Sequence, residues 1–398
     1  MKRMNGYALI LAGGASSRLF PFNKIMSDLS GTGKTLIQQA LMRAATLAPK
    51  QHISILAVKE SVLPLARQLR LSKKHFFVDP VRRGTWPALM WAMAHLRRQD
   101  PNAVVAVLTG DHIIPRLPAF RRAAQRACAL AAAQNSVVML GVEPGHHAAA
   151  WTGYGVFRVD GERVTAFAEK PSLAQAEKMR QEGGWQWNSG MFFFRIRTAE
   201  QALAIFQPAM RRQYDHLCAA VAQRKMTMAA KLYAEFPAKI PHPLDAARLV
   251  DNTIDFAIMT PLVHGRATNT SRDDLTPLAI CGGLPIWTDL GQWESLGDVR
   301  RLDRRNNIHV GRVRLDRATS GCILAADQGY AIDVRGLTHM AVAVSDRGLL
   351  VLSRQELPRI KEHVAQCAPQ KFLIVNPSGV RVQRSGRKVV VSGTPFIR

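Results

Sequence analysis

A glycine pair followed by an arginine lies near the start of the chain, in LAGGASSRLFPF at residues 11–22. The apolar residues before it are typical of a strand that ends in a loop at Gly13 and Gly14. Without side chains at these positions, backbone N–H groups can approach a phosphate or a base. Arg18 adds a forked positive charge suited to phosphate oxygens. Taken alone, a glycine pair after a strand is equally well an ordinary turn, so the loop leaves both interpretations open.

Two aspartates far apart in the sequence could share a metal ion. Asp111 follows an apolar run in LTGDHII, and Asp289 lies in a glycine-containing turn in WTDLGQW. A carboxylate at the end of a strand is placed where Mg²⁺ could bridge it to phosphates, whereas a lone aspartate in a turn is usually a cap. Phosphate transfer requires alignment, charge neutralisation and a metal ion. The pair therefore predicts a magnesium site.

The segment SGTGKT at residues 30–35 resembles the end of a P-loop. The full pattern requires glycine at position 28, where the chain has Asp28, and no apolar strand precedes the segment. We therefore exclude a P-loop nucleotide site here.

Strands alternate with helices over the first 260 or so residues. This alternation predicts an α/β fold with a doubly wound, mainly parallel sheet, whose ligands bind at the carboxyl ends of its strands. The glycine loop and Asp111 both follow predicted strands. The expected strands are residues 7–12, 53–58, 103–108 and 136–142, and the expected helices are residues 35–47, 86–96 and 118–134.

The pattern changes near Asn306, where short β-like runs with Gly, Asp and Ser turns begin. One helix is expected over residues 355–367, and the tail returns to short basic strands. We predict a boundary at about residue 300, with a large domain over residues 1–300 and a small β-rich domain with its tail over residues 301–398.

Composition restricts the class of protein. The chain has 398 residues, of which 47% are hydrophobic and 21% charged, as is typical of a soluble globular protein. No apolar run approaches the roughly 18–20 residues of a membrane span. The five cysteines are scattered and form no CxxC pair, which argues against a disulfide framework or a zinc site and favours a cytoplasmic protein.

The formal net charge of +25 is the most unusual global property. It permits nucleic-acid binding, but the basic residues are spread along the chain and no zinc-finger or RNP pattern accompanies them. Polyanionic substrates would explain part of the charge. We expect most of it to be solvated surface, and we do not expect a nucleic-acid or membrane partner.

The glycine loop, the two aspartate segments and several further segments occur in the same order as in the mannose-1-phosphate guanylyltransferases, which they resemble. These enzymes belong to the sugar-phosphate nucleotidyltransferase family of GT-A-like fold. The resemblance extends from about residue 7 to about residue 355. The glycine loop resembles the family's LAGGxGTRLWP, and WTDLGQWESL resembles WSDVGSWDAL. The other segments are DPVRRGTWPAL (79–89), GDHII (110–114), TGYG (152–155), FAEKP (167–171), WNSGMFFF (187–194) and TIDFAIM (253–259).

The resemblance implies roles for particular residues. Asp111 and Asp289 would bind magnesium, and with Arg18 and a loop lysine, for which we take Lys24, they would form the catalytic group. The backbone of Gly155 would contact the sugar phosphate. The side chains implied in that contact are Glu169, Lys170 and Asn188, and the implied nucleotide-binding residues are Leu11, Ala12, Gly13, Gly14, Arg83, Thr85, Gly110 and Asp111.

The chain departs from the family pattern at several positions. The family loop continues to a Pro-Lys pair whose lysine binds phosphate, but Ile25-Met26-Ser27-Asp28 stands at the corresponding place. Lys24 or Lys34 could replace that lysine, and spacing does not decide between them. Ser16-Ser17 replaces Gly-Thr, Gly84 replaces an asparagine, and Thr109-Gly110 replaces Pro-Ala.

The implied activity is Mg²⁺-dependent transfer of GMP from GTP to mannose 1-phosphate, giving GDP-mannose and pyrophosphate. The alternatives are another NTP and hexose 1-phosphate pair, or a nucleotide-sugar-binding regulatory protein that has lost catalysis. Bifunctional relatives carry an added isomerase domain, and the residues after Ser353 are too few to form one. A single transferase activity is therefore implied, in a possible homo-oligomer.

Overall fold

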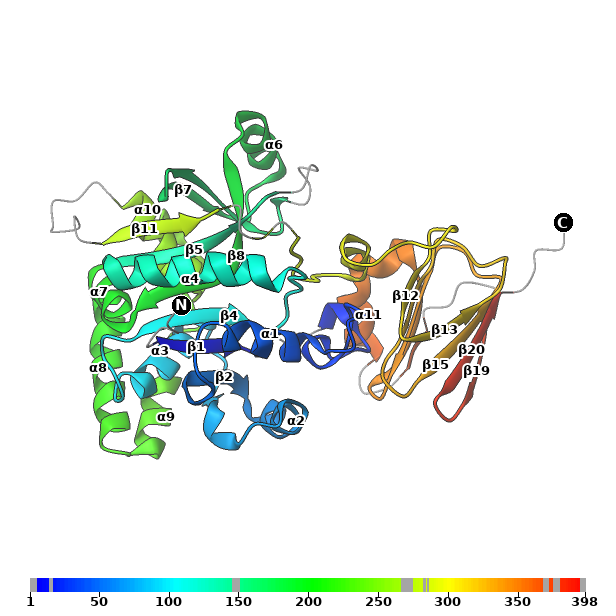
Figure 1. Ribbon diagram of the computed structural model, residues 1–398, viewed down its shortest axis with the longest axis horizontal. Coiled ribbons are helices and arrows are strands. Elements are labelled where there is room, and N and C mark those ends of the chain that lie inside the picture. The colour runs from blue at the N-terminus through cyan, green and yellow to red at the C-terminus, as the bar shows by residue number, and fades with distance from the viewer. Residues whose placement is uncertain are drawn as a thin grey trace. The chain divides into compact units, whose positions relative to one another are not determined.

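The computed structural model describes residues 6–13, 17–144, 151–265, 275–281, 284, 286–367, 372–374 and 380–393. The chain divides into two compact units (Figure 1). The first comprises Met1–Gly13, Leu41–Thr109 and Ile114–Ile286, and the second comprises Gly14–Ala40, Gly110–Ile113 and Trp287–Arg398. Each unit thus combines segments that are distant in the sequence. The domain boundary expected at residue 300 stays a prediction.

The first unit contains a nine-stranded mixed sheet in the order β3-β2-β1-β4-β8-β5-β11-β7-β6. The strands around β1 run parallel, and β8 is antiparallel to β4, β5 and β6. This confirms the expected α/β fold. The strands are β1 (Gly6–Leu11), β2 (Ile53–Val58), β3 (Phe76–Asp79), β4 (Val104–Thr109), β5 (Ser136–Val142), β6 (Gly155–Asp160), β7 (Arg163–Glu169), β8 (Trp185–Arg195) and β11 (Thr276–Ile280), beside a separate hairpin of β9 (Lys239–His242) and β10 (Asp245–Asp251).

The central strands are continuous apolar runs because helices cover both faces of the sheet. Alternate residues such as Leu9 and Val107 face one large core, to which α3, α7 and α8 also contribute, and α4 packs against β4 and β5. The helices are α1 (Leu36–Ala45), α2 (Lys59–Leu69), α3 (Thr85–Leu96), α4 (Leu117–Ala133), α6 (Leu173–Glu182), α7 (Ile196–Phe206), α8 (Pro208–Ala222), α9 (Met226–Ala234) and α10 (Thr260–His264), with 3-10 turns η3 (Lys50–His52) and η4 (Lys73–His75) and the π-helical turn η5 (Asp255–Met259).

The second unit is β-rich, as expected, and its two sheets pack face to face. A five-stranded sheet has the order β12-β14-β16-β17-β18, and a four-stranded sheet has the order β13-β15-β20-β19. The strands are β12 (Ile308–Val310), β13 (Arg312–Leu315), β14 (Ile323–Ala326), β15 (Ala331–Arg335), β16 (Met340–Ser345), β17 (Gly348–Ser353), β18 (Phe372–Ile374), β19 (Val380–Ser385) and β20 (Lys388–Gly393).

Each face of the five-stranded sheet has its own core. On one face, Leu324, Val342 and Val351 share a core with Val334 and Val391 of the four-stranded sheet. The opposite face packs against the segment that follows the glycine loop and against residues near Asp289. Its members include Leu19, Phe22, Leu29, Leu36, Ile113, Leu290, Trp293, Ile323 and Leu350. The second unit therefore fixes the segments that carry Lys24, Asp111 and Asp289.

The helix expected over residues 355–367 is divided in two. A 3-10 turn, η8 (Arg354–Arg359), precedes the α-helix α11 (Ile360–Cys367). Pro358 lies within η8, and proline lacks the N–H that a continuous α-helix would use. The other short turns of this unit are η1 (Ser17–Leu19), η2 (Lys24–Met26) and η7 (Trp293–Asp298).

Among the described residues, no helix combines the length and the apolar character needed to cross a bilayer.

Candidate functional site

The second unit brings together the two aspartates expected to bind metal. Asp111 follows β4, and Asp289 precedes η7. Ile113 and Thr288 form an isolated antiparallel bridge, with N···O distances of 2.9 and 3.2 Å, so the two segments lie side by side. Trp287 Nε1 also donates to His112 Nδ1 at 3.2 Å. Short backbone pairing thus places residues 111 and 289 in one cluster.

Lys24 forms hydrogen bonds with both aspartate residues, with the side chain of Asp111 and with the main chain of Asp289. Its Nζ lies 2.6 Å from Asp111 Oδ2 and also donates to the main-chain carbonyl of Asp289. The lysine is buried, with 9% of its surface exposed, whereas Lys34 lies exposed on the following loop. The sequence left these two lysines as alternatives, and Lys24 is the one beside Asp111.

The charges in this cluster stabilise the ionised form of Asp111. Burial opposes ionisation of the carboxyl group, but His112 and the Lys24 ammonium outweigh it, so the pKa of Asp111 is lowered. The side chain of Asp111 still keeps 33% of its surface exposed. A carboxylate that is ionised and accessible can accept a cationic or metal-bound ligand.

Asp111 and Asp289 carry the type of oxygen donor that magnesium prefers, and Asp289 Oδ1 also accepts the Gly291 amide at 3.0 Å, as a turn-forming aspartate does. Mg²⁺ is commonly held by one or two carboxylates together with water and substrate phosphates, without an all-protein cage. In the part of the chain that the structure describes, no three His, Cys, Asp or Glu side chains form a group able to hold a metal. A magnesium ion here would therefore depend on the two aspartates and on the substrate.

The glycine loop begins where expected, at the end of β1. Leu11 is half-buried, and the amide of Ala12 donates to Leu56 O at 2.8 Å. Gly13 is exposed, and a Cβ built on it would meet nothing within 4 Å, so its backbone is open to a ligand. Gly14 lies outside the described residues. Arg18 lies in η1 with its side chain exposed.

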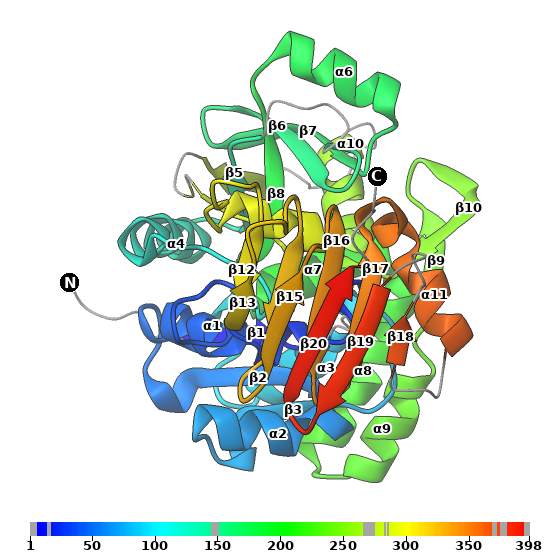
Figure 2. The same cartoon turned by 90° about the vertical axis from the view of Figure 1, so that its right-hand side faces the viewer.

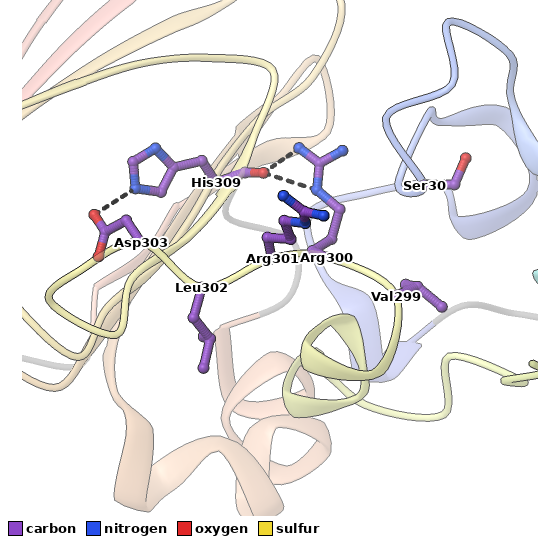
Figure 3. A pocket seen from close by; sticks show the side chains of 7 residues that line it. All are labelled: Ser30, Val299, Arg300, Arg301, Leu302, Asp303 and His309. Atoms are coloured by element: carbon purple, nitrogen blue, oxygen red, sulfur yellow. Dashed lines mark hydrogen bonds and ion pairs between the residues drawn. The ribbon is translucent and has the colours of Figure 1, made fainter.

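The SGTGKT loop forms no phosphate cradle. The Asp28 carboxylate accepts hydrogen bonds from the amides of Gly31, Thr32 and Gly33 at 2.7–3.1 Å. These are the donors that a P-loop would direct at phosphate, so the exclusion of that motif has a direct structural reason. Figure 3 shows the neighbouring recess, where Arg300 donates to the carbonyl of His309.

Two of the expected nucleotide-side residues flank the start of α3. Thr85 is exposed at its first position, while Arg83 Nη2 donates to Ala234 O at 2.6 Å. Gly110 is buried directly after β4 and next to Asp111. The guanidinium of Arg83 is thus partly engaged within the protein, whereas Thr85 remains available.

Gly84 explains one departure from the family pattern. Its φ is +104°, and a Cβ built there would lie 2.2 Å from Asn252 O. The same carbonyl accepts the amide of Trp86 at 3.1 Å, which ties the first turn of α3 to the segment before η5. No residue with a side chain fits this position without displacing backbone.

Restoring the family asparagine with Gly84→Asn is therefore expected to destabilise the protein, by about 2–5 kcal/mol from strained φ and overpacking. Gly161→Asn is the matched control, because Gly161 has a φ of +59° and open space around a built Cβ. Urea unfolding of the two variants would measure the difference. Equal stability of both variants would show that Asn252 moves aside freely.

The sugar-side residues gather in the first unit, where β6, β7 and β8 meet. Gly155 pairs with Glu169 in the sheet, and a Cβ at Gly155 would lie 2.5 Å from Glu169 Oε2 and 3.4 Å from Asn188 Cβ. Lys170 Nζ lies 2.9 Å from Glu169 Oε1. The absence of a side chain at residue 155 therefore allows the carboxylate and the amide to approach each other.

Asp255 is a member of this cluster that the sequence did not single out. Asn188 Nδ2 donates to Asp255 Oδ1 at 2.8 Å, and Asp255 begins the π-helical turn η5. π-Helical turns are frequent at functional sites. Asp255 lies in TIDFAIM, a segment used for the family resemblance without a role for any residue in it, so family likeness could have directed attention there.

Burial and, to a lesser extent, the nearby Glu169 carboxylate together raise the pKa of Asp255 to about 7, against the opposing effects of Lys170 and the Asn188 hydrogen bond. An acid whose pKa is higher in the folded state stabilises the fold below its unfolded pKa of 3.8, and this contribution is lost as pH rises toward 7. The two carboxylates thus make this cluster sensitive to pH near neutrality.

Replacement of Asp255 with asparagine should remove this sensitivity. The free energy of unfolding of the wild type, relative to that of Asp255→Asn, is expected to fall by about 2–3 kcal/mol between pH 5 and pH 8. Asp251→Asn, at an exposed position on β10, serves as the control. Urea unfolding at the two pH values would test the expectation, and an unchanged difference would mean that Asp255 is ionised throughout.

Comparison with known proteins identifies the family of the chain. A family model for nucleotidyl transferases matches residues 7–306. The xanthan biosynthesis protein XanB of Xanthomonas campestris pv. campestris (strain B100) is 31% identical over 372 residues, which cover 90% of this chain and 72% of XanB. A mannose-1-phosphate guanylyltransferase of Klebsiella pneumoniae is 27% identical, with 89% of this chain and 72% of the relative covered.

A solved structure also has the same fold. A protein from Thermus thermophilus, described as a mannose-1-phosphate geranyltransferase, superposes with a TM-score of 0.71 at 25% sequence identity. The alignment covers 91% of this chain and 99% of that one. The family model matches most of the chain, and the chain therefore belongs to the nucleotidyl transferase family.

Proposed function

We propose that the chain transfers GMP from GTP to mannose 1-phosphate, with magnesium, and releases pyrophosphate. A phosphate oxygen of mannose 1-phosphate forms a bond to the α-phosphorus of GTP, and the bond from that phosphorus to the pyrophosphate oxygen breaks. Relatives named mannose-1-phosphate guanylyltransferase support the choice of substrates. Within the family fold, the observation that carries the proposal is the contact of Lys24 with both Asp111 and Asp289.

The roles of the second-unit residues follow from their charges. Asp111 and Asp289 would hold magnesium, which when bound neutralises phosphate charge. Lys24 and Arg18 would bind phosphate oxygens, Arg18 through its planar fork and Lys24 as a point charge. Because such a transfer needs little covalent help, positioning and charge compensation are the main tasks of these side chains.

The roles of the first-unit residues follow from their hydrogen-bonding groups. The Glu169 carboxylate offers hydrogen-bond acceptors to sugar hydroxyls, and the Asn188 amide offers both a donor and an acceptor. The Gly155 backbone lies beside both side chains. Lys170 has 63% of its side chain exposed and can reach a phosphate. For the nucleotide, we propose contacts from Leu11, Ala12, Gly13, Gly14, Arg83, Thr85 and Gly110.

The experiment that tests the proposal is pyrophosphate release with Mg²⁺, crossing four NTPs with mannose 1-phosphate, glucose 1-phosphate and N-acetylglucosamine 1-phosphate. Release confined to GTP with mannose 1-phosphate is the expected result. Release with another pair would correct the specificity and keep the reaction class.

A non-catalytic nucleotide-sugar-binding protein is the second candidate, because the Pro-Lys pair of the family loop is missing. That candidate would gain support if no substrate pair released pyrophosphate while GDP-mannose still raised the melting temperature. The Lys24 contact with Asp111 disfavours it, since a lysine remains beside the carboxylate even without the family motif.

A further inference from the structure

The four-stranded sheet of the second unit has one covered face and one open face. Ile332, Val334, Val389 and Val391 point into the core shared with the five-stranded sheet. Because side chains alternate along a strand, their neighbours in sequence point the other way. Figure 2 shows this sheet in front, with β13, β15, β20 and β19 side by side.

The register of the strands identifies the residues on the open face. Arg312 pairs with Ala331, which pairs with Lys388, and Arg314 pairs with Asp333. Arg335 pairs with Ser392, which pairs with Arg381. The open face therefore carries five cations and one carboxylate, and we call it the basic face, defined by Arg312, Arg314, Arg335, Arg381, Lys388 and Asp333.

Most of this charge is not balanced by the protein. Asp333 is buried and pairs with Arg335 at 3.4 Å. Arg312, Arg314, Arg381 and Lys388 are exposed and make no ion pair with any described residue. Like charges held on a rigid sheet repel one another, so a bound polyanion would relieve this repulsion.

A hollow of about 290 Å³ lies within the basic face, lined by residues of β13, β15 and β20 that include Arg312, Arg314, Lys388 and Asp333. The three cations outnumber the one carboxylate, which is paired with Arg335, so the hollow suits a compact ligand with several negative charges. Arginine forks and a lysine ammonium bind phosphate oxygens well. The residues of the basic face include no aromatic side chain, so it offers no surface on which a base could stack.

We propose that the basic face is a second anion site, which binds the phosphate chain of an oligophosphate through Arg312, Arg314 and Lys388. The site is independent of the nucleotidyl transfer proposed above. The ligand could be inorganic or could be the triphosphate of a nucleotide, because the contacts reach phosphate alone. This site would also account for part of the large net charge of the chain.

The test measures binding of inorganic tripolyphosphate to the full chain by calorimetry, in the wild type and in the double variant Arg314→Gln/Lys388→Gln. The double variant is expected to bind one equivalent of tripolyphosphate fewer than the wild type. Alternatively, it binds this equivalent at least about tenfold more weakly for each cation removed. The matched control is Arg121→Gln/Arg122→Gln, which removes two exposed charges from α4 and should bind as the wild type does. Because the readout is a difference of one equivalent, it does not depend on whether the proposed nucleotidyl transfer is correct.

Further arms identify the ligand. GTP and ATP should lose the same equivalent in the variant, whereas citrate should bind the basic face far more weakly than tripolyphosphate does. Unchanged binding in the variant, or an equal loss in the α4 control, would overturn the proposal. Equal binding of citrate would overturn the assignment to phosphate, and tighter variant-sensitive binding of an oligonucleotide would assign the face to nucleic acid instead.

Discussion

Asp111→Asn is expected to lower the rate of pyrophosphate release by at least about 10³-fold, equivalent to about 4 kcal/mol of transition-state stabilisation. The substitution keeps the shape of the side chain and removes its negative charge. Magnesium would lose one of its two proposed carboxylate ligands. The amide oxygen can still accept a hydrogen bond from Lys24, so the contact that holds the two segments together is weakened and not lost.

The measurement is steady-state pyrophosphate release with Mg²⁺ varied over a wide range. Asp245→Asn removes one exposed carboxylate on β10 and serves as a control for net charge. Near-normal release in Asp111→Asn would remove Asp111 from the proposed metal site. A circular dichroism melt should show that both variants stay folded, because the side chain of Asp111 is one-third exposed.

Continuous apolar runs for the strands and helical apolar spacing for the helices were sufficient to predict the central elements of the first unit. The strands over residues 53–58 and 136–142 have the predicted bounds, and α3 begins one residue before the predicted helix. Strands buried on both faces leave a clear signal, because each position is selected for burial. The helix expected over residues 355–367 lacked such a signal and is interrupted at η8.

Contacts between distant residues could not be predicted in the same way. Sequence spacing could not choose between Lys24 and Lys34, since the choice depends on a contact with Asp111, which lies 87 positions further along the chain than Lys24. The role of Gly84 likewise depends on Asn252 O. Asp255 was missed because its neighbours Glu169 and Asn188 come from β7 and β8. In each case the packing of several strands determines the local chemistry.

Lys24→Met is expected to have the second large effect, a fall of about 10²–10³-fold in kcat, the loss typical when one charged or hydrogen-bonding group is removed from a transition state. Methionine is similar in length and apolar, so it can occupy the buried position that Lys24 holds. The Asp111 carboxylate would lose the ammonium 2.6 Å away, and the Asp289 carbonyl would lose a donor. Lys34→Met removes an exposed lysine from the next loop and is expected to leave kcat unchanged.

A second readout separates two possible effects of Lys24. In the absence of substrates, the Lys24 ammonium lies beside the Asp111 carboxylate. Its positive charge would repel a divalent ion that binds the same carboxylate. Binding of Mn²⁺ in the absence of substrates, followed by electron paramagnetic resonance, should therefore be tighter in Lys24→Met than in the wild type. Weaker Mn²⁺ binding together with lower kcat would mean that Lys24 supports the metal site, and normal kcat would show that another residue replaces the missing family lysine.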